Sequence, residues 1–180
     1  MITVEPLLPR RLEIGGHPAP VPGFEQLPAG VRWGTDRLPY PDGTFAEVYS
    51  SHVIEHVPWW LTQAAITEAV RVLEPGGLLE IHTVDFGYLV RCYQARDAGD
   101  GWQARGKNPH LHPIRWLASR LYSVDEDLGG DNWHRAVFDW PYLVELLSGA
   151  GLAGIDRAWE PRGREKHGAI NIGIRGRKPA

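Results

Sequence analysis

The order of apolar segments and turns predicts an α/β fold whose sheet is mostly parallel and ends in an antiparallel hairpin. Short strands are expected over residues 12–14 and 45–51, and the clearest helix follows over residues 59–77. Strands that alternate with helices are typical of a parallel sheet with helices on both faces. The last two apolar segments, 153–160 and 169–175, are joined by the charged turn "PRGREKHG", which favours a hairpin.

The first strand leads into "RLEIGGHPAPVPGF", a glycine turn followed by three prolines. Each proline removes an N–H and biases the residue before it toward extended backbone, so no helix is expected between residues 18 and 30. A second short strand is expected over residues 31–34. The "PDG" turn then precedes the strand at 45–51.

The predicted helix at 59–77 has a mostly apolar face at helical spacing, and Pro75 and Gly76 end it. A strand over residues 78–84 follows, after which Asp85 stands where it would cap the next helix. Two polar loops around a short helical stretch make residues 99–133 a lid or an insertion on the substrate side. Further helices are expected over residues 85–96 and 114–122, and from Asp139 or Trp140 to the glycines at 149 and 151.

Composition excludes several classes of function. The 180 residues are 43% hydrophobic, which is enough for one domain over residues 1–180, and they carry a net charge of −3. This charge gives no electrostatic reason to expect nucleic acid or an anionic membrane as partner, and no apolar run approaches the roughly 18 residues of a membrane span. Cys92 is the only cysteine, so a disulfide frame is excluded. We expect a cytoplasmic monomer or homodimer that acts on a small molecule.

A site is expected at one edge of the predicted sheet. In open α/β sheets, ligands lie in the crevice at the carboxyl ends of the strands. The stretches that follow the strands should therefore border the site. They are residues 15–19, 36–38, 50–56 and 82–86.

Four segments, in order, carry a resemblance to a known family: "RLEIGG", "DRLPYPDGTFAEVYSSHVIEHV", "ITEAVRVLEPGGLLEIHTVD" and "HRAVFDWPYLVELLSGAGL". They resemble the S-adenosylmethionine-dependent class I methyltransferases, in particular the small single-domain type 11 branch, and they span nearly the whole chain. The resemblance implies a Rossmann-like three-layer sandwich with a shortened N-terminal half. It also implies S-adenosylmethionine as the cofactor.

The resemblance implies which residues contact that cofactor. The first motif departs from the family pattern, because His17 and Pro18 follow the glycine pair and the acidic residue that normally ends the second strand has only a shifted Glu25 as counterpart. The alternatives are ordinary structural roles, such as a tight turn, a strand charge or a turn cap. The implied contacts are Glu13, Gly15 and Gly16 in the first motif, Asp36, Arg37 and Leu38 toward the adenine, and Ser51 and His52 near the methionine end.

Methyl transfer requires alignment of the acceptor with a sulfonium methyl group, and an oxygen nucleophile also needs a base. Histidine has a pKa close to neutral and suits that role. His56, His134 and Asp85 are the candidate catalytic residues, since the predicted topology brings all three to the same edge of the sheet. Each has a local alternative: a hydrogen-bonding histidine for His56 and His134, and a helix cap for Asp85.

The sequence "HVIEH" also matches an inverted zinc-protease pattern, in which two histidines four residues apart on a helix share a metal. Here the pair follows a predicted strand and precedes Pro58, so we predict no metal site. A different metal role for His52 or His56, together with Asp85 or His134, is left open.

The predicted function is S-adenosylmethionine-dependent methylation of a hydroxyl or amine on a small molecule, such as a sugar or a secondary metabolite. Two alternatives are kept. The fold could serve a non-methylating reaction without this cofactor, or the chain could be a non-catalytic partner subunit. Titration with S-adenosylmethionine separates the first hypothesis from both alternatives.

Overall fold

The computed structural model describes residues 8–15, 20–95, 112–123, 132–162 and 167–180. Within these ranges, six strands form one sheet in the order β2-β1-β3-β4-β6-β5. The strands β2, β1, β3 and β4 are parallel, whereas β6 runs antiparallel to both β4 and β5. This arrangement confirms the mostly parallel sheet with a C-terminal hairpin. The strand bounds are β1 Arg11–Ile14, β2 Glu25–Gln26, β3 Phe45–Ser51, β4 Leu73–Val84, β5 Ala153–Ala158 and β6 Asn171–Arg177.

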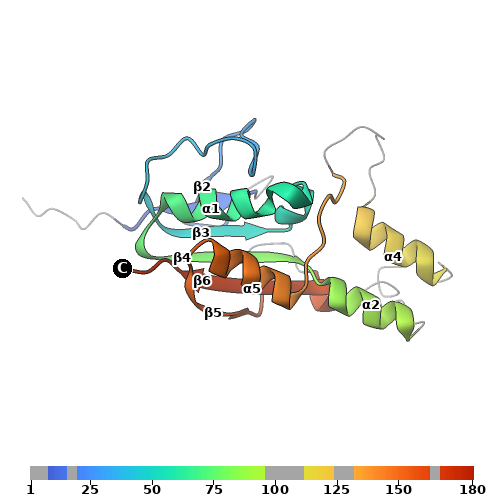
Figure 1. Cartoon of the computed structure of the whole chain (residues 1–180). Helices are drawn as coiled ribbons and strands as arrows, with labels where there is room; N and C mark the ends of the chain where they lie inside the picture. The colour runs from blue at the N-terminus through green and yellow to red at the C-terminus, as the bar shows by residue number, and fades with distance from the viewer. Residues whose placement is uncertain (1–7, 16–19, 96–111, 124–131, 163–166) are drawn as a thin grey trace, which may run out of the picture.

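The described α-helices occupy two places around the sheet. Helices α1 (Thr62–Val72) and α5 (Trp140–Gly149) pack side by side on one face (Figure 1). Helices α2 (Phe86–Gln94) and α4 (Pro113–Tyr122) pack together beyond the carboxyl end of β4 (Figure 1). Three single-turn helices complete the described elements: η1 Ile54–His56, η2 Trp59–Leu61 and η3 Gly168–Ile170.

The face of the sheet under α1 and α5 is apolar. Val48 lies opposite Leu79 in the β3–β4 register, and both side chains are fully buried. Successive side chains of a strand point to opposite faces, so these residues and Ile81 meet the helices, where Ile66 and Leu143 are also fully buried. The main hydrophobic core is therefore the layer between the sheet and these two helices.

The opposite face of the same strands carries buried polar residues. Tyr49 lies opposite Glu80 in the register, and both are covered by Phe24 and the side chain of Arg162. The Arg162 guanidinium pairs with Glu47 at 2.6 Å and with Glu80 at 2.8 Å, and its backbone N–H donates to the Tyr49 hydroxyl at 2.8 Å. Carboxylates can be buried on this face because one arginine compensates both of them.

The N-terminal half is short, as predicted. Strand β2 has two residues, and no helix occurs between β1 and β3 among the described residues. The strand expected over residues 31–34 is wrong, because this stretch forms turns. The indole N–H of Trp33 donates to the Ala65 carbonyl at 2.7 Å. Gly34 has a φ of +91°, and a Cβ there would come within 2.7 Å of Val57. Close packing on α1 therefore bends the chain where its apolar residues suggested a strand.

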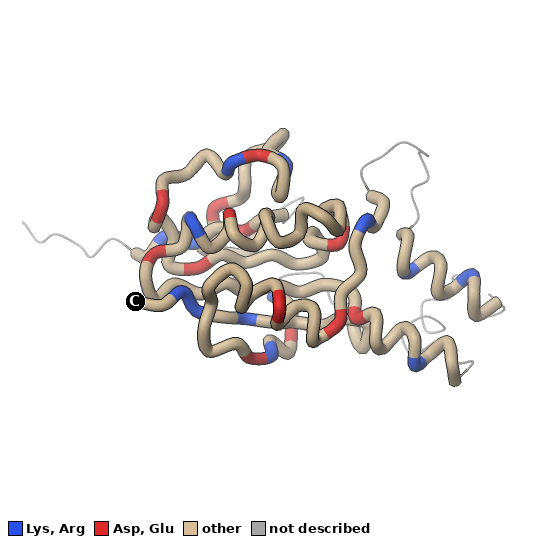
Figure 2. The backbone as a smooth tube through the Cα atoms, viewed as in Figure 1, with Lys and Arg blue, Asp and Glu red and all other residues tan. Residues whose placement is uncertain are grey.

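The helix boundaries follow local signals with one shift. Asp85 accepts a hydrogen bond from Tyr88 N at 3.0 Å, so the predicted N-cap is confirmed. Asp139 accepts one from Tyr142 N at 3.0 Å and caps α5, which begins at Trp140. The helix predicted over 59–77 is shorter, because α1 covers Thr62–Val72 and β4 already begins at Leu73. Asp85 also pairs with Phe138 in an isolated bridge, which brings the start of α5 to the carboxyl end of β4. Figure 2 shows acidic positions where these elements meet.

Candidate active site

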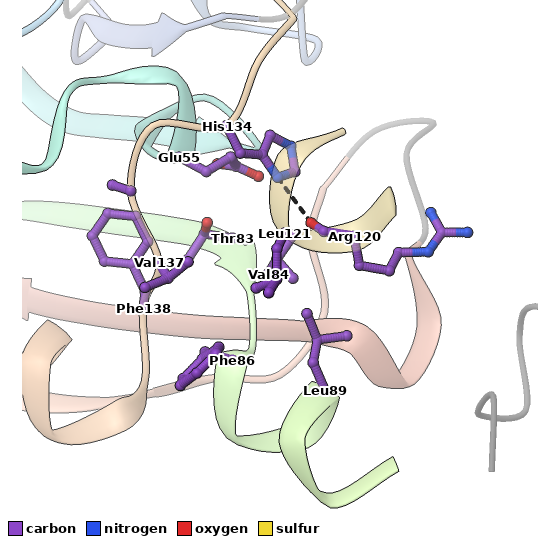
Figure 3. A pocket seen from close by; sticks show the side chains of 11 residues that line it. Glu55, Thr83, Val84, Phe86, Leu89, Arg120, Leu121, His134, Val137 and Phe138 are labelled. Atoms are coloured by element: carbon purple, nitrogen blue, oxygen red, sulfur yellow. Dashed lines mark hydrogen bonds between the residues drawn. The ribbon is translucent and has the colours of Figure 1, made fainter. Parts of the chain in front are cut away.

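A pocket lies at the carboxyl end of β4, at the edge where the sequence predicted a crevice. The strand end, η1, α2, α4 and the segment before α5 all contribute to it. The segment is held by backbone hydrogen bonds from Arg135 N to Glu55 O at 2.7 Å and from Phe86 N to Phe138 O at 2.9 Å. The enclosed space is about 10 Å³, room for one water-sized group. Its lining consists of Glu55, Thr83, Val84, Phe86, Leu89, Arg120, Leu121, His134, Ala136, Val137 and Phe138 (Figure 3).

Glu55 is the most deeply buried charge in this lining, with 1% of its surface exposed. Its Oε1 lies 3.0 Å from His52 Nδ1, while its Oε2 has no hydrogen-bond partner among the described residues. Burial alone raises the pKa of the Glu55 carboxyl, but the hydrogen bond and the attraction to His52 lower it by more. The net pKa lies below the ordinary value, so Glu55 is ionised at neutral pH.

His134 faces Glu55 across the pocket (Figure 3). Its Nδ1 lies 3.0 Å from the Arg120 carbonyl oxygen. A carbonyl can only accept, so Nδ1 carries the proton and Nε2 keeps the lone pair in the neutral ring. Burial lowers the pKa of His134, and the nearby Glu55 charge opposes this only in part. The ring is therefore a neutral imidazole at physiological pH, in one defined tautomer.

The other two predicted catalytic residues lie beside the pocket and do not line it. The His56 ring packs edge-on against the His134 ring, with centroids 5.0 Å apart, and its Nδ1 lies 3.3 Å from the Trp133 carbonyl oxygen. Asp85 caps α2, the alternative role that its position left open. The structure thus brings together His134, Glu55 and Thr83, of which the sequence singled out only His134. Glu55 and Thr83 lie within the stretches 50–56 and 82–86 that were expected to border the site, but no motif marked either of them as a site residue.

The first motif forms an ordered turn at Gly15, with φ of +106°. Gln26 Nε2 donates to the Gly15 carbonyl at 2.9 Å, and a Cβ at Gly15 would lie 2.5 Å from Val53. Glu13 is buried and accepts a hydrogen bond from Val21 N at 2.5 Å. Gly16, the second predicted glycine contact, lies outside the described residues.

The residues predicted to approach the adenine make contacts within the chain. Asp36 accepts a hydrogen bond from Arg32 N at 2.8 Å in an exposed turn, and Arg37 lies 3.5 Å from Asp42. Leu38 is 1% exposed and belongs to the core under α1.

The carboxylate expected near the end of the second strand also has another role. Glu25 forms two hydrogen bonds to Arg10, at 2.7 and 2.8 Å. The strand itself ends with Gln26, whose amide is bonded to Gly15. Among the described residues, β2 therefore ends without a carboxylate.

His52, predicted near the methionine end, belongs to a hydrogen-bonded chain. Its φ is +54°, and its Nε2 lies 3.2 Å from Asn171 Oδ1. Asn171 Nδ2 lies 3.2 Å from His82 Nδ1, and His82 Nε2 lies 3.2 Å from Glu80 Oε1. The chain Glu55–His52–Asn171–His82–Glu80 therefore joins the pocket to the polar face of the sheet. We refer to these five residues as the polar chain.

The polar chain places one histidine against each buried carboxylate. His52 faces Glu55, and His82 faces Glu80. The Asn171 side chain bridges the two rings, with its oxygen and its nitrogen each 3.2 Å from a ring nitrogen. The ring of His52 also stacks on His167, with centroids 3.5 Å apart.

Two further properties concern the described ranges only. No three His, Cys, Asp or Glu side chains there are grouped closely enough to hold a metal ion. None of the helices there is long and apolar enough to cross a membrane. Ser51, the remaining predicted contact, ends β3 next to His52 and is partly buried.

Comparison with known proteins agrees with the observed fold. Residues 25–81 match the family model of a methyltransferase domain. A protein from Thermotoga maritima, described as an S-adenosylmethionine-dependent methyltransferase and possible histamine N-methyltransferase, has a similar structure. It has 20% sequence identity and a TM-score of 0.53, with 96% of this chain and 84% of that chain covered. The chain therefore has the fold of class I S-adenosylmethionine-dependent methyltransferases.

Two other structures share this methyltransferase-like fold. The S-adenosylmethionine-dependent methyltransferase SibL, in its apo form, has 14% identity and a TM-score of 0.55, with 97% of this chain and 51% of that chain covered. A methyltransferase from Methanosarcina mazei has 18% identity and a TM-score of 0.50, with coverages of 87% and 66%. At these identities the likeness establishes the fold, and the chain spans only about half the length of SibL. No protein of curated function matches the sequence.

S-adenosylmethionine is the cofactor that the methyltransferase-domain match over residues 25–81 suggests. Its described residues fit that molecule in part. Gly15 makes a turn with positive φ at the carboxyl end of β1, and Ser50 Oγ fixes the preceding residue by a hydrogen bond to the Ile14 carbonyl at 3.1 Å. The end of β2 does not fit, because Gln26 stands where a ribose-binding carboxylate is expected.

Proposed function

We propose that the protein transfers a methyl group from S-adenosylmethionine to a hydroxyl or amine of a small molecule. The observation that carries this proposal is His134, a neutral imidazole of fixed tautomer at the carboxyl edge of a methyltransferase fold. A base of this kind is what an acceptor needs when it must lose a proton on attack. The net charge of −3 supports a small-molecule acceptor over nucleic acid. We further propose a cytoplasmic monomer or homodimer.

In this proposal the cofactor supplies an electrophilic methyl group, and the residues of the chain do the rest. Gly15 and Gly16 contact the cofactor through their backbone, with Glu13 ordering the loop and Ser51 and His52 bordering the methionine end. His134 accepts the acceptor's proton on Nε2, and His56 packs against its ring. The apolar lining, such as Phe138 and Leu121, excludes water from the pocket. The remaining predicted contacts are Asp36, Arg37 and Leu38. In this proposal they hold their loop against α1 and so support the cofactor site indirectly.

The insertion over residues 99–133 is proposed to cover the acceptor. Its helix α4 contributes Arg120 and Leu121 to the pocket, and the Arg120 carbonyl fixes the His134 tautomer. The rest of the insertion, 99–111 and 124–131, lies outside the described residues. The contact of α4 with α2 at the pocket supports the proposal that α4 lies beside the bound acceptor.

The test is a calorimetric titration of the protein with S-adenosylmethionine and with its product S-adenosylhomocysteine. Saturable binding of both is expected, and His134→Gln should keep this binding while losing turnover. The matched control is His112→Gln, since His112 caps the far end of α4 and does not line the pocket. Absence of binding at millimolar concentrations of both ligands would reject the proposal.

One observation favours a second candidate function. The missing carboxylate at the end of β2 suits a fold that has been reused for another reaction without S-adenosylmethionine. Under that alternative, neither cofactor nor product binds, yet His134→Gln still abolishes turnover of the true substrate. A purely structural partner subunit would tolerate the same substitution.

A further inference from the structure

Two buried oxygen atoms of the pocket have no partner in the described part of the chain. They are Glu55 Oε2 and the Thr83 hydroxyl, whose residues are 1% and 0% exposed. An unsatisfied buried polar group is costly, and an unsatisfied buried charge costs more. Both residues line the same small space, and Figure 3 shows their oxygen atoms turned toward it. A bound group that donates hydrogen bonds would satisfy both.

The charge of the pocket indicates whether the hydrogen-bond donor bound there is neutral or cationic. Glu55 is ionised, and its Oε1 is already paired with His52 at 3.0 Å. Its Oε2 has no partner among the described residues, and the His134 ring across the pocket is neutral. Arg120 belongs to the lining, but Figure 3 shows its guanidinium pointing away from Glu55. The pocket therefore presents a carboxylate oxygen and a hydroxyl to its occupant, a combination that suits a cation.

The size and the walls of the pocket narrow the choice. The space of about 10 Å³ admits a single water-sized group, and an ammonium head has about that size. The rings of Phe86 and Phe138 line the space, and aromatic rings attract ammonium cations. A carboxylate group or a phosphate on the acceptor would meet Glu55 with like charge and would be too large.

We propose that this pocket binds an ammonium group, so that the acceptor is a primary or secondary amine. This assignment rests on the proposed methyl transfer and names the acceptor class within it. Glu55 Oε2 and the Thr83 hydroxyl accept hydrogen bonds from the ammonium N–H groups, and the rings of Phe86 and Phe138 lie beside the ammonium.

The reaction then balances with the groups already named. The ammonium gives one proton to His134 Nε2, and the resulting amine nitrogen forms a bond to the methyl carbon. The carbon–sulfur bond of the sulfonium breaks with its electron pair left on sulfur, which gives a neutral thioether and a methylated ammonium. Glu55 keeps the nitrogen in place before and after transfer, because the nitrogen is cationic in both states.

The experiment follows the backbone amide signals of Thr83 and His134 by nuclear magnetic resonance while a small probe is added. Ethylammonium is compared with ethanol and propionate, each with and without saturating S-adenosylhomocysteine. Ethylammonium should shift both signals in a saturable way and bind at least about tenfold more tightly than ethanol, as expected for a charged hydrogen bond. Equal affinity of the three probes would overturn the assignment.

Three variants locate the binding. Glu55→Gln removes the charge and should weaken ethylammonium binding roughly tenfold or more. Thr83→Val keeps the shape, removes one acceptor and should weaken binding by a smaller factor, so the test stands even if Glu55→Gln fails to fold. Glu145→Gln, on the exposed side of α5, is the matched control and should bind as the wild type does. An equal loss in Glu145→Gln, or no loss in Thr83→Val and Glu55→Gln, contradicts the assignment.

Failure of this inference is distinguishable from failure of the proposed function. If S-adenosylhomocysteine binds but ethylammonium shows no preference, methyl transfer stands and the acceptor class is wrong. If ethylammonium binds through Glu55 but S-adenosylhomocysteine does not bind, the ammonium site is real and the proposed methyl transfer is rejected. Turnover of amines with S-adenosylmethionine, absent with the matching alcohols, would support both.

Discussion

At the scale of residues, two of the buried carboxylates depend on histidine partners in the polar chain. Glu55 and Glu80 stand at opposite ends of the polar chain, and each is held by one histidine. Burial raises the pKa of the Glu80 carboxyl, but the His82 hydrogen bond and the Arg162 charge lower it by more. Both glutamates therefore have a lower pKa in the folded state than in the unfolded state. Both side chains are buried, so it is the hydrogen bonds and charges of His52, His82 and Arg162 that keep them ionised.

This difference predicts a pH-dependent stability that Glu80 controls. A carboxyl whose pKa is lowered on folding stabilises the protein above its unfolded value, near 4.5, and loses that contribution as the pH falls through the folded value. Glu80→Gln should cost about 2 kcal/mol of unfolding free energy above pH 5. The difference from wild type should shrink as the pH falls below 4.5. Urea unfolding between pH 7 and pH 3 measures it.

The control for this prediction is Glu145→Gln, a carboxyl at an exposed position of α5. It should follow the wild-type curve at every pH, since exposed charges contribute little. A cost of Glu80→Gln that stays constant from pH 7 to pH 3 would show that packing, and not the charge, is what the substitution removes.

At the scale of elements, the turn after β1 depends on a glycine for two separate reasons. Gly15 has a φ of +106°, and a Cβ there would lie 2.5 Å from Val53 Cγ2. Gly15→Ala should therefore combine backbone strain with a steric clash and lower the free energy of unfolding by about 2–4 kcal/mol. Chemical denaturation followed by tryptophan fluorescence measures this loss.

Gly76 separates the two causes. It also has a positive φ, of +80°, but nothing lies within 4 Å of its Cβ position. Gly76→Ala should show the strain alone, about 1 kcal/mol. Adding Val53→Ala to Gly15→Ala removes the clashing methyl group and should recover part of the loss. If the two glycine variants lose the same stability, close packing against Val53 is not the reason for Gly15.

At the scale of elements, local sequence patterns are sufficient to predict helix caps but not every turn. Asp85 and Asp139 were predictable as caps, because a cap acts on a backbone N–H three residues away. Residues 31–34 were not predictable, because their turn depends on α1, some thirty residues later in the chain. Glu55 was missed for a related reason. Its importance comes from burial and from Thr83 and His134, which other elements bring to it.

At the scale of the whole molecule, one arginine closes the polar face of the sheet. Arg162 follows β5, yet its guanidinium pairs with Glu47 on β3 and Glu80 on β4. It also lies over the rings of Phe24 and Tyr49, 5.6 and 5.3 Å from their centroids. Segments from both ends of the chain are thus joined over strands that α1 and α5 cover only from the other side (Figure 1).

Arg162→Leu tests this role, because it removes the guanidinium that pairs with both Glu47 and Glu80. Only Arg11 then remains near Glu47, at 3.4 Å, and only His82 near Glu80, at 3.2 Å. Arg162 is one-third exposed, so water moderates the effect, and we expect a loss of about 2–3 kcal/mol in the free energy of unfolding. Arg175→Leu is the matched control, since Arg175 pairs with Asp156 at 3.4 Å on the surface and should cost little. Adding Glu80→Gln to Arg162→Leu removes one uncompensated charge and should restore part of the stability at pH 7. If urea unfolding shows that Arg162→Leu loses as little free energy of unfolding as Arg175→Leu, the stability of the polar face does not depend on this arginine. The polar chain alone must then compensate the buried carboxylates.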